Sequence, residues 1–223
     1  MWTYQQKHTP VMPRSAPIAK PETPRIPTAS SRDVSLLWLL AFAGSYLAGE
    51  AWGSLLCQKL SSGPLVYLQY YYENILSLCR EDQFPLLFGT RFLSLFVLFT
   101  AILLMGLCTF GLPALFALAF LKGAATGSFL IQLLLEEGRQ GMLSAILLFW
   151  PVEALAAVLS LYLFRAASRS SLALWRTSRG ARPVSLQSLQ NRLMRVYLLN
   201  SILAILPCGL AVLLCQLFGF LLD

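Results

Sequence analysis

Long apolar blocks constrain this chain more than any other feature of its sequence. Five runs of about twenty residues or more occupy residues 34–56, 92–110, 113–135, 141–164 and 194–222. A helix needs about 20 predominantly apolar residues to cross a hydrocarbon core of about 30 Å. Only 12% of the residues are charged, which is far below the share in soluble domains. The sequence therefore predicts an all-α, polytopic integral membrane protein whose domain, residues 34–223, crosses the lipid bilayer with five transmembrane helices.

The segment before the first run has a different composition. Residues 1–33 contain six prolines and more basic than acidic side chains. Such a stretch cannot bury enough apolar surface to form a core. We expect it to be a disordered, proline-rich, basic cytoplasmic tail.

Charge between the runs predicts their orientation. From Arg165 to Arg195 there are seven arginines and no acidic residue, whereas residues 57–91 balance three basic against three acidic residues. Basic loops stay in the cytoplasm. We therefore expect a basic cytoplasmic loop at 165–193, an extracytoplasmic interfacial segment at 57–91, a cytoplasmic N-terminus and a C-terminus outside. Anionic lipid head groups are a further possible ligand of the arginines, although orientation alone explains them.

Three ionisable residues fall inside the apolar runs, where a charge is expensive. Counted from the cytoplasmic end of each helix, Lys122 and Glu153 lie at about 14 and about 16 Å depth. Their helices are consecutive, so we predict a structural intramembrane ion pair. A proton or ion relay is the functional alternative. Glu50, at about 24 Å by the same count, is expected to reach interfacial water.

Small residues recur at every fourth position in two of the runs. Ridges of this kind let membrane helices approach closely, within one chain or between two copies. Proline suits the first turn of a helix, and the short connection before the third run predicts a tight hairpin. We expect four residues to serve helix packing: Gly111, Pro113, Gly123 and Gly127.

The segment after the first run is rich in tyrosine and leucine. It predicts an interfacial helix at the outer head groups, whose tyrosines serve as belt residues or contact an external partner. These tyrosines are Tyr67, Tyr70, Tyr71 and Tyr72. Cys57 and Cys79 flank this segment and could pair in an oxidising space, while small buried hydrophobes remain the simpler interpretation of the five cysteines.

The chain has little material for catalysis. His8 is its only histidine, and it lies in the tail. Glu136 and Glu137 resemble the paired glutamates of CAAX-type membrane proteases, but Arg139 follows at the wrong spacing and the apolar runs lack histidine. No nucleophile-elbow, zinc-protease or phosphate-loop motif occurs. We expect no enzyme activity, no catalytic, metal or cofactor site, and no nucleic-acid partner.

One block carries a resemblance to a known family. Residues 111–134, GLPALFALAFLKGAATGSFLIQLL, resemble the stage II sporulation protein M family of spore-forming bacteria. In that family a Gly-x-Pro turn opens a membrane helix that carries a Lys-Gly pair and another glycine four residues later. The matching positions here are Gly111, Pro113, Lys122, Gly123 and Gly127. Weaker similarities are the tyrosine-rich segment at 70–74 and Pro151 in the fourth run.

The resemblance implies a non-catalytic membrane scaffold of the endospore engulfment machinery. Such a scaffold would localise its peptidoglycan-degrading partners, stage II sporulation proteins D and P, at the sporulation septum or in the engulfing mother-cell membrane. The residues themselves leave a second possibility, a small membrane transporter or permease subunit that uses Glu50, Lys122 and Glu153.

Overall fold

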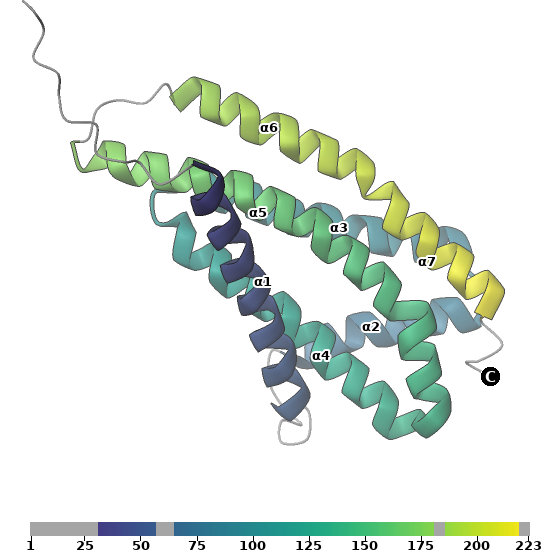
Figure 1. Ribbon diagram of the computed structural model, residues 1–223. Coiled ribbons are helices and arrows are strands. Elements are labelled where there is room, and N and C mark those ends of the chain that lie inside the picture. Colours follow the sequence, from purple (N-terminus) through teal and green to yellow (C-terminus); the bar gives the residue numbers. More distant parts are fainter. Residues whose placement is uncertain (1–30, 57–64, 181–185, 219–223) are drawn as a thin grey trace, which may run out of the picture.

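The computed structural model describes residues 31–56, 65–180 and 186–218 (Figure 1). The predicted tail, apart from its last three residues, lies outside them, as does Cys57. Every regular element in the described part of the chain is helical. The helices are α1 (Ser31–Leu56), α2 (Leu65–Arg80), α3 (Phe84–Gly106), α4 (Gly111–Ser144), a π-helical turn (Ala145–Phe149), α5 (Trp150–Ser178), α6 (Leu186–Leu203) and α7 (Ile205–Phe218).

Within the described residues, four helical stretches are long and apolar enough to cross a membrane, so the chain is a multi-pass membrane protein. They are Phe84–Gly106, Gly111–Leu135, Gly138–Ser178 and Gln187–Phe218. Gly138 has non-helical backbone angles, which divide α4 between the second and the third of these stretches. The first predicted span forms α1, which is not among these four and packs along α4. Figure 1 shows α1 crossing in front of α4, and α6 running beside α5.

Several boundaries differ from the sequence expectation because helices continue through polar residues. The tail was expected to extend to residue 33, but α1 begins at Ser31. The second apolar run starts at 92, whereas α3 begins at Phe84 with a proline in its first turn, where the missing N–H is not needed. Most of the segment expected to be a basic loop at 165–193 is helical, because α5 extends to Ser178 and α6 begins at Leu186.

Pro207 divides the last apolar run. A proline inside a helix removes one hydrogen bond and its ring clashes with the carbonyl four residues earlier. That residue is Leu203, where α6 ends, and α7 begins at Ile205. A proline in the middle of an apolar run predicts a kinked helix from the sequence, and the structure shows this kink as a break between two helices.

Glycines hold α1 and α4 at close range. A Cβ added at Gly49 would collide with the carbonyl oxygen of Phe120, and one added at Gly123 would collide with that of Tyr46. Gly53 and Gly127 are equally tight against the facing backbone. Membrane helices associate through such close packing because lipid chains supply no hydrophobic driving force. The small-residue ridges thus meet each other within one chain.

The connection between α3 and α4 is short and tied to α5. A Cβ at Gly111 would collide with the carbonyl oxygen of Met105, so only glycine fits this turn. The Ser171 hydroxyl donates a hydrogen bond of 2.9 Å to the carbonyl of Cys108. Pro113, in the first turn of α4, is exposed. Gly111 therefore permits the tight hairpin, and Pro113 makes no buried contact.

A disulfide joins α2 to α7. Cys79 pairs with Cys215, 136 residues later, with their Cα atoms 5.8 Å apart. The interpretation of Cys79 and Cys215 as unpaired buried hydrophobes was therefore wrong, and the alternative partner considered for Cys79, Cys57, is not the one it has. Spacing in sequence suggested the nearer partner, whereas helix packing brings the distant cysteine alongside.

We predict opposite effects for two alanine substitutions in α1. Alanine is favoured over glycine in a helix by about 1 kcal/mol. Gly44→Ala should therefore leave the melting temperature in detergent unchanged or raised, because nothing lies within 4 Å of the added Cβ. Gly49→Ala should lower it, because α1 must move away from α4. Equal melting temperatures for the two variants would show that this helix contact contributes nothing.

Candidate functional site

A buried ion cluster lies at the centre of the bundle. The Glu153 carboxylate accepts hydrogen bonds from Arg91 Nη1 at 2.6 Å and from Lys122 Nζ at 2.8 Å. These three groups come from α5, α3 and α4. The side chains of Arg91 and Glu153 are only 7% and 6% exposed, and that of Lys122 is 23% exposed. The structure thus brings the two residues of the predicted pair together and adds a second cation.

Apolar layers enclose this cluster on both sides. One buried group of side chains lies toward the arginine-bearing ends of α5 and α6, and the other lies toward α2. On each of three helices the charged residue separates the two groups. The flanking residues are Leu87 and Leu95 around Arg91, Ala119 and Ala125 around Lys122, and Phe149 and Ala156 around Glu153. Apolar residues therefore flank each charge along its helix, and the charges depend on one another for neutralisation.

Tyr72 completes the cluster from α2. Its hydroxyl accepts a hydrogen bond from Lys122 Nζ at 2.9 Å and lies 3.4 Å from Glu153 Oε1. Its ring stacks on Phe129, with the centroids 4.4 Å apart. Tyr72 is only 1% exposed, so its assignment to a partner surface was wrong. Tyrosine at a membrane surface and tyrosine that satisfies a buried charge have the same sequence signal.

The other tyrosines of this segment point in different directions. Tyr70 is 72% exposed, and Tyr71 is half-buried beside Tyr72. The side chain of Tyr67 lies outside the described residues. Of the four predicted surface tyrosines, the structure therefore leaves Tyr70 on the surface.

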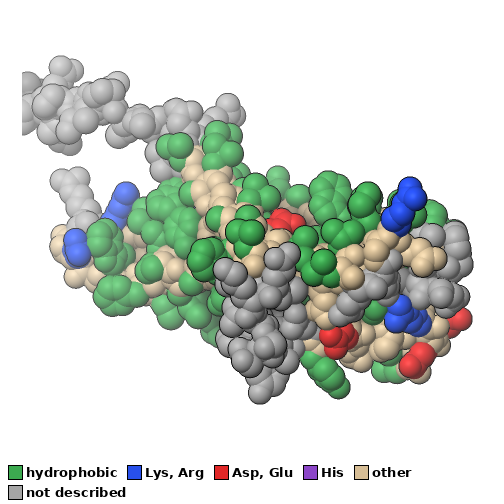
Figure 2. Space-filling view, turned by 90° about the horizontal axis from the view of Figure 1, so that it is seen from below, with side chains coloured by type: hydrophobic (Ala, Val, Ile, Leu, Met, Phe, Trp, Pro, Cys, Tyr) green, Lys and Arg blue, Asp and Glu red, His purple; other side chains and the backbone are tan. Residues whose placement is uncertain are grey.

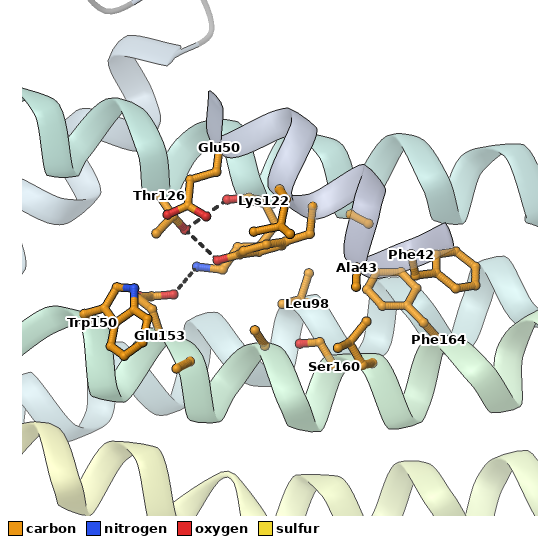
Figure 3. A pocket seen from close by; sticks show the side chains of 16 residues that line it. Phe42, Ala43, Glu50, Leu98, Lys122, Thr126, Trp150, Glu153, Ser160 and Phe164 are labelled. Carbon is orange, nitrogen blue, oxygen red and sulfur yellow. Dashed lines mark hydrogen bonds and ion pairs between the residues drawn. The ribbon is translucent and has the colours of Figure 1, made fainter. Parts of the chain in front are cut away.

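A cavity of about 250 Å³ adjoins the cluster between α1, α4 and α5. Its wall includes Glu50, Lys122 and Glu153, and Figure 3 shows the two glutamates on opposite sides of the lysine. Most of the remaining wall is apolar, including Phe42 and Phe164. Glu50 therefore lines this cavity from α1 and is half-buried.

A second, more open groove of about 690 Å³ lies between α2, α3 and α4. Lys122 and Tyr72 line it as well. The lysine thus stands between two hollows on different sides of α4. Glu50 lines the first hollow, and both cations pair with Glu153.

Sequence reasoning missed Arg91 and treated it as the end of an outer loop. The signal was Pro85, which is typical of a helix start and would have placed Arg91 two turns inside α3. An arginine within an apolar helix requires a counter-charge, and Glu153 was already available. Both cations would then have been expected at one carboxylate.

At this site two cations neutralise one carboxylate, and these contacts hold the helices together. Both oxygens of Glu153 are engaged by cations, which opposes its action as a base. No group of three or more His, Cys, Asp or Glu side chains within the described ranges could hold a metal ion. Comparisons with protein-family models, curated proteins and solved structures find no match to this chain.

We predict that Glu153→Gln costs about 3–5 kcal/mol of unfolding free energy, because it leaves two buried cations without their shared counter-charge. Arg91→Gln should cost less, since Lys122 still neutralises the carboxylate. Titration with denaturing detergent, monitored by circular dichroism, measures the unfolding free energy of each variant. The exposed Glu81→Gln is the control and should change stability by less than about 0.5 kcal/mol.

The double variant Arg91→Gln/Glu153→Gln measures the interaction free energy between the two side chains. It should be more stable than the sum of the two single losses predicts, because it leaves one buried cation in place of two. Additive losses would contradict a direct interaction between these side chains.

Proposed function

We propose that this protein is a non-catalytic membrane scaffold of the endospore engulfment machinery. Its role would be to localise peptidoglycan-degrading partners, stage II sporulation proteins D and P, at the sporulation septum. The resemblance of residues 111–134 to the stage II sporulation protein M family supports this proposal. The observation that carries it is the doubly paired Glu153, since a neutralised carboxylate holds four helices together and suits a fixed platform.

The proposed topology has five spans, with α1 as the first. The N-terminus and the arginine-bearing ends of α5 and α6 lie in the cytoplasm, and α2 and the C-terminus lie outside. Figure 2 supports this orientation, because one end of the visible face shows Lys and Arg without acidic side chains, while the other end carries both signs. The disulfide between α2 and α7 also fits an oxidising exterior.

The proposed partner surface is the outward face of α2. Tyr70 is exposed there together with Glu73 and Asn74, whereas Tyr72 on the opposite face is buried. Aromatic residues are enriched in binding hot spots. Tyr72 and Cys79 fix α2 to the bundle, so this surface is already ordered before a partner binds.

Deletion of the gene in the source organism, followed by membrane staining of sporulating cells, tests the scaffold proposal. Arrest after septation, rescued by the wild-type gene, is the expected result. Complete engulfment in the deletion strain would refute it.

A small transporter or permease subunit is the second candidate. The observation that favours it is the cavity bounded by Glu50, Lys122 and Glu153, since carboxylates at membrane depth are common parts of transport paths. A solute-uptake defect with normal spores would support this candidate over the scaffold.

We predict the orientation from labelling of two single-cysteine variants. In a background without reactive native cysteines, a membrane-impermeant thiol reagent should modify Asp82→Cys in intact cells and spare Ser178→Cys. Both positions are exposed, so access to the reagent depends on the side of the membrane. Permeabilised cells are the control, in which both should react. The reverse pattern in intact cells would overturn the orientation.

We predict that Tyr70→Ser reduces recovery of the peptidoglycan-degrading partners by co-purification, with a loss of up to about 2 kcal/mol of binding free energy. Membrane abundance should be unchanged because Tyr70 makes no buried contact. Tyr162→Ser is the matched control, since Tyr162 is 62% exposed on α5, distant in sequence from α2. Equal recovery with both variants would place the partner surface elsewhere.

A further inference from the structure

Three arginines converge on a cavity between α5 and α6. The two helices lie side by side in Figure 1, and the cavity between them measures about 250 Å³. Arg165 and Arg169 line it from α5, and Arg192 lines it from α6. Leu189, Leu193 and Val196 form the apolar part of the wall on α6. One hollow thus combines guanidinium groups from two helices with an aliphatic surface.

The charge of this segment favours an anion. No acidic residue occurs in the sequence from Arg165 to Arg195. Guanidinium groups gathered at one site repel each other, and a bound phosphate oxygen relieves that repulsion while accepting their N–H groups. Arg169 and Arg192 supply this charge from opposite walls.

The position of the cavity favours a lipid. It lies near the ends of two membrane-spanning stretches that end at Ser178 and begin at Gln187. Basic pockets between transmembrane helices near the membrane surface bind phospholipid head groups. The aliphatic residues beside the arginines match an acyl chain, which a soluble phosphate ion lacks.

We propose that this cavity binds the phosphate head group of an anionic phospholipid, with an acyl chain against Leu189 and Val196. The site is separate from the ion cluster at Glu153 and from the outward face of α2. Its occupancy ties the arginine-bearing ends of α5 and α6 together.

Two double variants with equal loss of charge test the proposal. Arg169→Gln/Arg192→Gln removes one cavity arginine from each helix. Arg176→Gln/Arg195→Gln removes one exposed arginine from each helix outside the cavity. The delipidated full-length protein is titrated with phosphatidylglycerol, phosphatidylcholine or inorganic phosphate. Native mass spectrometry measures retained lipid, and the melting temperature in detergent reports stabilisation.

Wild type and the exposed-arginine variant should retain phosphatidylglycerol in preference to phosphatidylcholine. The cavity variant should bind it roughly 30-fold more weakly, about fivefold for each arginine. If the cavity double variant does not fold, Arg192→Gln alone, at an exposed position, should show the roughly fivefold loss. Equal weakening in both double variants would overturn the site, because only general charge would then matter. Stabilisation by inorganic phosphate equal to that by phosphatidylglycerol would overturn the lipid assignment.

Discussion

Glu153 places a carboxylate in the interior of an apolar bundle, where an unpaired charge would cost several kcal/mol, and cations from two other helices neutralise it. Arg91 and Lys122 cannot reach it unless α3, α4 and α5 have one relative register. Tyr72 extends the same requirement to α2. A purely apolar interior would permit many packings of these helices, whereas this cluster satisfies its polar groups in one. The hydrogen-bonded charges therefore determine the relative register of α3, α4 and α5.

The attachment of α1 follows a different physical principle. Its contact with α4 depends on glycine, because two backbones approach at a distance that no side chain would allow. Serine hydroxyls add hydrogen bonds across the contact, from Ser45 to the Phe116 carbonyl and from Ser54 to that of Gly127. The close approach also carries Glu50 to the edge of the central cavity. Packing of α1 thus places a second carboxylate at the cavity that Lys122 lines.

The two ends of the bundle offer different chemistry. One end gathers arginines on α5 and α6, and the other presents α2, fixed by Tyr72 and by the disulfide to α7. A fixed interior with two distinct ends suits the proposed scaffold, with the proposed lipid site at one end and the proposed partner surface at the other. The proposed functions of the two ends are separable, because the variants that test them share no residue.

Much of the fold followed from the sequence alone. Apolar runs of sufficient length indicated an all-helical membrane protein, and four of the predicted spans correspond to helical stretches able to cross a membrane. Pro207 indicated the break in the last run, because the clash with the preceding turn is local. The pairing of Lys122 with Glu153 also followed, since depth can be counted along two consecutive helices and a buried charge needs a partner.

Tertiary structure alone decided which distant groups meet. Tyr72 turned inward because α2 packs against α3 and α4, and no local pattern encodes that approach. Cys79 met Cys215 across 136 residues for the same reason. Sequence determined what each helix must bury or neutralise, since hydrophobicity and charge belong to individual residues. Only the packing of helices could choose the partner, because a contact is a property of two surfaces in space.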